Sequence, residues 1–182
     1  MRAGRGEAAL LVVDMINPLD FAGGAALLRQ ALPVARTIAR FKRRLKARGV
    51  PAIYVNDNFS HWLCDFRELV AICSQPGTVG APLAQLLAPE HDDYLVLKPK
   101  HSGFLASPLD VLLAQLRARR VIVTGIAGDG CVLATAADAH MRDYTVHVPA
   151  DGCASLTRAR NARALQLLKD SMQVDLRGTR SL

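Results

Sequence analysis

The sequence predicts an α/β fold in which short parallel strands lie in the middle of the molecule and helices connect them. Short runs rich in Val, Ile and Leu recur along the chain, and longer segments with helical spacing separate them. These runs are apolar at nearly every position. Such strands are typical of a parallel sheet that helices cover on both faces, because neither face then meets water.

Candidate strands lie at residues 8–13, 52–56, 94–97, 121–124 and 145–148, and a less regular run suggests a sixth at 172–176. Helices are predicted at residues 25–48, 65–73, 108–118, 132–141 and 159–171. Two Pro and two Gly between 74 and 82 predict a loop there.

Length and composition favour one domain that spans residues 1–182. With 51% hydrophobic and 21% charged residues, the chain has a globular composition. The net charge of +7 could indicate nucleic acid binding, but the surplus lies on helical faces without interleaved aromatic residues. No run approaches the roughly 18–20 apolar residues that span a bilayer. We therefore expect a cytoplasmic protein that binds neither nucleic acid nor membrane.

The cysteines predict reduced thiols and no structural metal. The chain has four of them, at positions 64, 73, 131 and 153, with no CxxC pair and no His at the spacing of a zinc finger. We accordingly expect no cofactor.

Three reactive side chains follow three different strands of the predicted sheet. Asp14 follows the first strand, Lys98 the third, and Cys131 comes after the fourth strand and the turn IAGDG. Ligands of open parallel sheets bind beyond the carboxyl ends of the strands, so these groups are candidates for one site. Lys100 stands two residues beyond Lys98, and spacing does not choose between the two lysines.

The position of Cys131 at the start of a predicted helix indicates a nucleophile. The helix dipole and the free backbone N–H groups there are expected to favour the thiolate and to bind the oxyanion of a tetrahedral intermediate. Asp14 could act as the base that takes the thiol proton, and a neighbouring lysine would stabilise both anions. The hypothesis is attack by the Cys131 thiolate on a small carbonyl substrate.

Four segments, LLVVDMINPLDF, IYVNDNF, VLKPKHSGF and TGIAGDGCVLATAADA, resemble in order those of the isochorismatase-like cysteine hydrolase family, which includes nicotinamidases and other small-amide hydrolases. The resemblance implies a three-layer α/β/α, Rossmann-like architecture with a six-stranded, mainly parallel sheet, and a homo-oligomer, either dimer or tetramer. It implies a catalytic triad of Asp14, Lys98 and Cys131. It selects Lys98 over Lys100, because the family's lysine stands four residues before the small residue that is Ser102 here.

The resemblance also implies a cis peptide bond between Ile126 and Ala127. That bond would direct the N–H groups of Ala127 and Cys131 at the substrate oxygen, as an oxyanion hole. The family's usual threonine after this bond is Gly128 here, which we expect to loosen the loop. Asp129 is predicted to brace the turn before Cys131.

The predicted substrate pocket contains Phe21, Asn56, Trp62, His101 and Phe104, although the three aromatic side chains could equally belong to the core.

Nicotinamidases carry a metal site built from an Asp with His residues close by. Here Asp57 is followed by Asn58 and Phe59, and His61 alone is near, so we expect no metal.

The predicted function is a cysteine hydrolase that cleaves a small amide or related C–N bond through a thioester. Two alternatives stay open: the same thiol chemistry on a carbamoyl or ureido substrate, and a member of the family that binds a small molecule without turning it over. Members that cleave isochorismate lack a cysteine at the position of Cys131, which argues against vinyl-ether hydrolysis. A nucleotide-binding interpretation of GIAGDG is disfavoured, because its spacing fits neither common phosphate-loop motif.

Overall fold

The computed structural model describes residues 7–59 and 62–181, and its centre is a six-stranded sheet. The strand order is β3-β2-β1-β4-β5, with β6 also paired to β4, and every paired strand is parallel. The strands are β1 (Ala8–Val13), β2 (Ala52–Asp57), β3 (Tyr94–Lys98), β4 (Arg120–Ile126), β5 (Thr145–His147) and β6 (Cys153–Ala154). The predicted α/β class with a six-stranded parallel sheet is confirmed.

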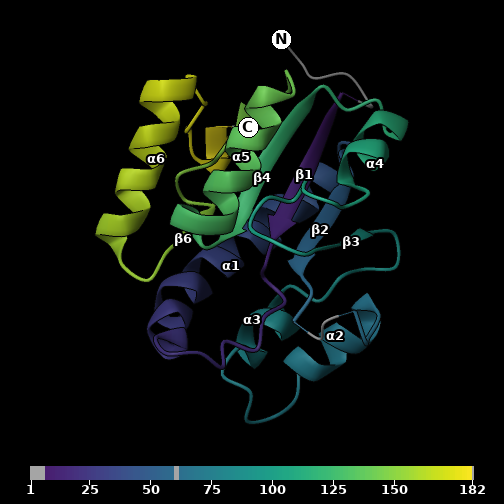
Figure 1. Cartoon of the computed structure of the whole chain (residues 1–182), viewed down its shortest axis with the longest axis vertical. Helices are drawn as coiled ribbons and strands as arrows, with labels where there is room; N and C mark the ends of the chain where they lie inside the picture. The colour runs from purple at the N-terminus through teal and green to yellow at the C-terminus, as the bar shows by residue number, and fades with distance from the viewer. Residues whose placement is uncertain (1–6, 60–61, 182) are drawn as a thin grey trace.

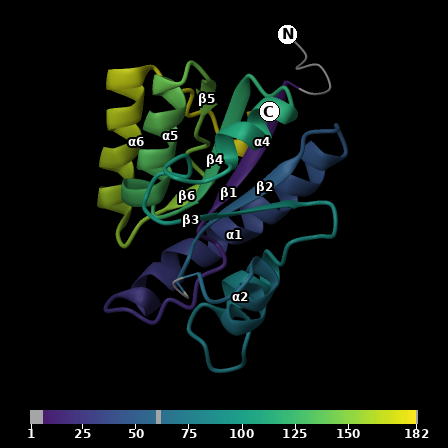
Figure 2. The same cartoon turned by 45° about the vertical axis from the view of Figure 1, so that its right-hand side comes forward.

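Helices cover both faces of this sheet (Figures 1 and 2). One face packs against α1 (Gly24–Lys46), α2 (Phe66–Cys73) and α3 (Ala81–Leu86). The other packs against α4 (Leu109–Gln115), α5 (Leu133–Met141) and α6 (Arg158–Met172), with α5 and α6 side by side. Within the described ranges, no helix combines the length and the apolar character that crossing a membrane requires.

The first strand shows why the apolar runs are continuous. All six residues of β1 are buried. Leu10 and Val12 lie in the core beneath α1, whereas Leu11 and Val13 lie in the core beneath α4 and α5. Because successive side chains of a strand point to opposite faces, a sheet with two covered faces needs an apolar residue at every position.

Two predicted elements differ from the structure. The sixth strand was expected at 172–176, but there only Asp175 forms an isolated bridge, to His147, and the sixth strand of the sheet is β6. The reason is that α6 continues to Met172 and the left-handed Gln173 then turns the chain, which leaves little length for a strand.

The second difference is α3, which begins inside the predicted loop. Pro82 lies in the first turn of this helix. Proline is well tolerated there, because N–H groups in the first turn have no partner within the helix. Pro82 is one of the two prolines from which the sequence predicted a loop.

The strand order brings the ends of β1 and β4 together. From β1 the chain moves outward through β2 and β3, and it then returns to place β4 on the other side of β1. Gly125 near the end of β4 has φ +123°, and a Cβ there would lie 2.0 Å from the carbonyl oxygen of Val13. Only glycine allows this approach. The segments that follow β1 and β4 therefore meet at this edge of the sheet, beyond which ligands of such sheets bind.

Candidate active site

Asp14 is the first residue after β1, and its carboxylate is almost completely buried. Its backbone has φ 51°, a left-handed conformation that is unfavourable for most residues but tolerated by Asp. This turn directs the side chain across the end of β2, where Oδ1 accepts the N–H of Asp57 at 2.7 Å. The second oxygen, Oδ2, lies 2.9 Å from Nζ of Lys98.

Lys98 is the last residue of β3 and is fully buried. Its long side chain crosses the end of β2 to reach Asp14. Besides that carboxylate, Nζ contacts the carbonyl oxygen of Lys100 at 3.1 Å, the sulfur of Cys131 at 3.5 Å and a carboxylate oxygen of Asp57 at 3.7 Å. The side chain of Lys100 is exposed, so the structure brings Lys98 and not Lys100 into the cluster.

Cys131 lies in the turn Gly128–Val132 that leads from β4 into α5, and its side chain is half-buried. Asp14, Lys98 and Cys131 thus come together from the ends of three strands, as the sequence predicts. The expectation that the helix start favours the thiolate is not met. Burial, followed by the nearby Asp14 carboxylate, raises the pKa of the Cys131 thiol to about 12.

The two charged neighbours are also shifted. Burial raises the pKa of the Asp14 carboxyl, and this effect outweighs the Lys98 ammonium and the hydrogen bonds to the carboxylate. For Lys98, burial lowers the pKa, but the Asp14 carboxylate and the Cys131 sulfur outweigh burial and leave the pKa raised. A thiol that holds its proton beside a carboxylate of raised pKa is an arrangement for proton transfer between the two.

The peptide bond between Ile126 and Ala127 is cis, as the resemblance implies. The carbonyl oxygen of Ala127 accepts the N–H groups of both Gly130 and Val132, which closes the turn around Cys131. That the N–H groups of Ala127 and Cys131 form an oxyanion hole stays a prediction.

The position of Gly128, which the sequence suggested would loosen this turn, is tightly surrounded by other side chains. The position is buried, and a Cβ there would lie 2.0 Å from Oδ1 of Asn161 and 3.1 Å from Oγ of Ser155. Both of these residues come from the segment around the start of α6, and they occupy the space that a larger residue at 128 would need. Asn161 and Ser155 thus fill the space that a side chain at position 128 would occupy.

Asp129 braces the turn through the same segment. Its N–H donates to Oγ of Ser155 at 3.1 Å, and its carboxylate forms an ion pair with Nε of Arg160. Burial works against this charge, but the hydrogen bond to Ser155 and the Arg160 guanidinium leave the pKa of Asp129 lowered. The supporting role of α6 was not visible in the sequence, because these residues are about thirty positions away from the turn.

Two residues of the predicted substrate pocket are buried in the protein instead. Phe104 is 4% exposed and packs in the core, with its ring 5.9 Å from that of Tyr144. Asn56 is fully buried: its amide donates to the carbonyl oxygen of Ile16 and its Oδ1 accepts the N–H of the same residue. Spacing in the sequence did not decide which way these two side chains point. In the structure both point into the protein.

The other three pocket candidates are accessible. Phe21 and Trp62 are 47% and 59% exposed. His101 is exposed in the loop after β3, and its Nδ1 lies 3.4 Å from the sulfur of Cys131. The loop is held to α5 by hydrogen bonds from Ser102 to Asp138 and from Gly103 N–H to Thr135.

The residues considered for a metal do not form a ligand set in the described part of the chain. Asp57 faces Nζ of Lys98, and Oδ1 of Asn58 accepts the N–H of Trp62. His61 lies outside the described residues.

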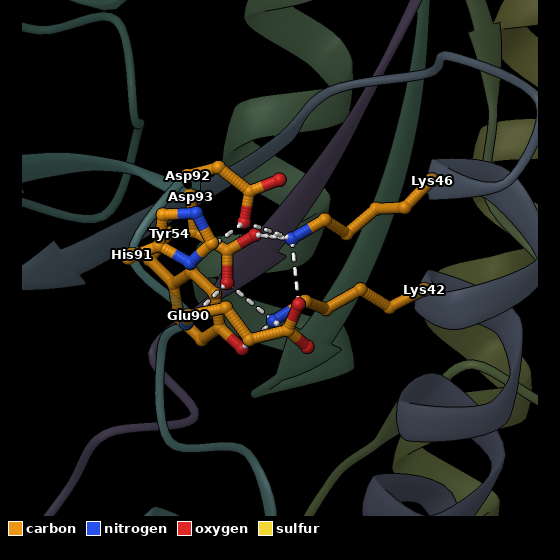
Figure 3. Close-up of polar contacts among 7 residues, drawn as sticks. All are labelled: Lys42, Lys46, Tyr54, Glu90, His91, Asp92 and Asp93. Carbon is orange, nitrogen blue, oxygen red and sulfur yellow. Dashed lines mark hydrogen bonds and ion pairs between the residues drawn. The ribbon is translucent and has the colours of Figure 1, made fainter.

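A different carboxylate cluster, of Glu90, Asp92 and Asp93, lies at the loop before β3. Figure 3 shows the ammonium groups of Lys42 and Lys46 directed at these carboxylates. Nζ of Lys46 lies 2.7, 2.5 and 2.9 Å from oxygens of the three acids. Two lysines thus already supply the positive charge that a bound cation would bring, and the cluster serves to attach α1 to this loop.

The fold and this cluster of Asp14, Lys98 and Cys131 define an isochorismatase-type hydrolase. The sequence matches the Isochorismatase domain over residues 8–179. It is 34% identical over 172 residues to the uncharacterized isochorismatase family protein YaaI of Bacillus subtilis, covering 94% of each chain. The chain therefore belongs to the isochorismatase family and is a hydrolase of that family.

The names of more distant relatives state their substrates. The ureidoacrylate amidohydrolase RutB of Methylorubrum extorquens is 30% identical over 170 residues, which cover 78% of this chain and 67% of that protein. Solved structures share the fold at 24% identity: N-carbamoylsarcosine amidase from Thermoplasma acidophilum, with a TM-score of 0.72 over 95% and 96% of the two chains, and the nicotinamidase from Staphylococcus aureus, with 0.71 over 94% and 99%.

Proposed function

We propose that this protein hydrolyses a small amide or related C–N bond through a thioester on Cys131. The observation that carries the proposal is the contact of three reactive groups from three strand ends: Nζ of Lys98 lies 2.9 Å from Asp14 and 3.5 Å from the Cys131 sulfur. A carboxylate, an ammonium and a thiol in one partly buried cluster are the parts that nucleophilic catalysis at a carbonyl requires.

In the first half of the reaction, Asp14 takes the thiol proton while the sulfur bonds to the carbonyl carbon. The carbonyl oxygen becomes an oxyanion, which the N–H groups of Ala127 and Cys131 are proposed to bind. When the carbonyl re-forms, the C–N bond breaks and Asp14 returns its proton to the departing nitrogen. Ammonia or an amine leaves, and the acyl group stays on sulfur as a thioester.

In the second half, Asp14 takes a proton from water as the water oxygen bonds to the thioester carbon. The C–S bond then breaks, and the proton returns to the sulfur. Lys98 supports both halves because its ammonium keeps Asp14 ionised before each proton transfer. The substrate and one water together give the acid and ammonia or an amine, so the reaction balances without any cofactor.

A carbamoyl or ureido compound is a second candidate substrate, and the names of two relatives favour it. RutB acts on ureidoacrylate, and the Thermoplasma enzyme is an N-carbamoylsarcosine amidase. In such a compound the carbon attacked by sulfur carries nitrogen on both sides, and the same proton transfers release ammonia from one side. The chemistry of Asp14, Lys98 and Cys131 would be unchanged.

The test is release of ammonia from a panel of small primary amides and N-carbamoyl compounds. We expect at least one compound to be hydrolysed, Cys131→Ala to abolish its turnover, and Cys64→Ala, which removes another half-buried thiol, to leave turnover intact. Intact-mass spectrometry should detect an acyl adduct on the wild-type protein and none on Cys131→Ala. Equal turnover by wild type and Cys131→Ala would contradict the proposal. Binding without ammonia release would favour the non-catalytic alternative.

A further inference from the structure

The sulfur of Cys131 has three polar neighbours on the described residues, and they lie on two sides. Asp14 and Lys98 are buried on the interior side, where Nζ of Lys98 lies 3.5 Å from the sulfur and 2.9 Å from Oδ2 of Asp14. His101 is exposed on the solvent side, and its Nδ1 lies 3.4 Å from the same sulfur. His101 is thus the exposed one of these three neighbours.

The single proton of the thiol bears on the role of His101. An ionised carboxylate can only accept hydrogen bonds, so Asp14 is the acceptor for the S–H proton in the proposed proton transfer. The sulfur then has lone pairs left for other neighbours, and the Nδ1–H tautomer of His101 can donate to one of them. A hydrogen bond of this kind becomes stronger when the acceptor carries a full negative charge.

Lys98 cannot donate a second hydrogen bond to the sulfur of Cys131. An ammonium group has three N–H bonds, and Nζ of Lys98 has neighbours for all of them in Asp14, the carbonyl oxygen of Lys100 and the Cys131 sulfur. Asp57, 3.7 Å away, faces the same ammonium. The interior thus offers the sulfur one donor and one anion, and Asp14 disfavours the thiolate.

His101 is also held in place by the helix that carries the nucleophile. The next two residues of its loop are hydrogen-bonded to α5, Ser102 Oγ to Asp138 at 2.6 Å and Gly103 N–H to Thr135 Oγ1 at 3.0 Å. Cys131 lies in the turn that enters this helix. The imidazole and the sulfur are therefore positioned by the same element, so their contact does not depend on a freely moving loop.

We infer that His101 is a catalytic residue whose Nδ1–H stabilises the thiolate of Cys131 from the solvent side. The inference rests on the proposed function, because it assigns His101 to the same nucleophile. It moves this residue from the lining of a pocket to direct contact with the reacting atom. Asp14 remains the group that takes the thiol proton, and His101 lowers the free energy of the anion that results.

The experiment follows the alkylation of Cys131 by iodoacetamide, which needs no knowledge of the substrate. His101→Phe keeps a ring and removes the N–H donor. His101→Asn removes the ring and keeps an N–H on the atom bonded to Cγ, as Nδ1 is in histidine. We expect His101→Phe to slow alkylation of Cys131 at neutral pH by about tenfold or more, as loss of a hydrogen bond to a charged group implies. The pH at which alkylation accelerates should also move upward. His101→Asn should recover most of the rate, and His140→Phe, on the exposed end of α5, is the matched control.

Two results overturn the inference. One is an alkylation rate and pH profile of His101→Phe equal to those of wild type; the other is equal slowing by Phe and Asn, because the effect would then not come from the donor. With ammonia release still dependent on Cys131, either result removes His101 alone and leaves the proposed function standing. Ammonia release that persists unchanged in Cys131→Ala would instead contradict the proposed function, and the role of His101 with it.

Discussion

Lys98 and Asp14 form a buried ion pair at the carboxyl ends of the strands, with Nζ 2.9 Å from Oδ2 and the two residues 0% and 4% exposed. A buried charge is stable only while its partner is present, because the interior does not solvate it as water does. The pair therefore links folding stability to the candidate active site.

Removing one member of this pair should destabilise the protein strongly. For Lys98→Met we expect a loss of about 3–5 kcal/mol in the free energy of unfolding, because Asp14 is left buried without its counter-charge. Urea unfolding measures this loss. The double variant Asp14→Asn with Lys98→Met should be more stable than the sum of the single losses predicts. Strict additivity would show that the two side chains are not coupled.

The ion pairs in Figure 3 make a second prediction about stability. The Asp93 carboxylate is fully buried and contacts Nζ of both Lys42 and Lys46, and the Lys42 side chain is 4% exposed. We expect Asp93→Asn to cost about 3 kcal/mol in urea unfolding, since the buried Lys42 then faces a neutral amide and keeps the half-exposed Glu90, 3.3 Å away, as its counter-charge. Asp92→Asn is the matched control, because this acid is half exposed and its loss should leave stability close to that of wild type. Equal effects of the two changes would argue against burial as the cause.

The close packing around Gly128 predicts that a larger residue there clashes with Asn161 and that removing the Asn161 amide relieves the clash. A threonine at 128 would place Cβ 2.0 Å from Oδ1 of Asn161, so Gly128→Thr should lower the melting temperature and slow the alkylation of Cys131. Asn161→Ala removes the obstructing amide, and the double variant should be more stable than Gly128→Thr alone. Thermal unfolding of the four proteins forms the double-mutant cycle. No recovery in the double variant would mean that another contact, such as that with Ser155, limits this position.

Alkaline pH should weaken the fold through Cys131. The folded-state pKa of about 12 lies above the value of about 8.5 for a free thiol, so the folded state holds the proton more tightly than the unfolded state. The resulting stability is fully present below about pH 8.5 and is lost as the pH rises through the folded value. Urea unfolding should therefore show a stability difference between wild type and Cys131→Ala that shrinks from pH 8 to pH 10. Cys64→Ala controls for the loss of a thiol, and a difference independent of pH would contradict the raised pKa.

The layout of the sheet could be predicted because most of its strands contain short runs rich in Val, Ile and Leu. β6 could not, because Cys153–Ala154 has only two residues and pairs with β4 far along the chain. For the site, Asp14, Lys98 and Cys131 were identifiable from their positions after strands. Asn161 and Arg160 were not, because they support the Cys131 turn from a separate helix.

The sequence by itself determined which chemical groups stand at the ends of the strands, since strand periodicity and chain order place them at one edge of the sheet. Only the tertiary structure decided how those groups affect one another. It buried Phe104 and Asn56, brought His101 to the Cys131 sulfur, and raised the pKa of the Cys131 thiol through burial and the Asp14 carboxylate. The physical reason is that burial and electrostatic interaction depend on distances between segments that are far apart in the chain, and local sequence patterns do not specify those distances.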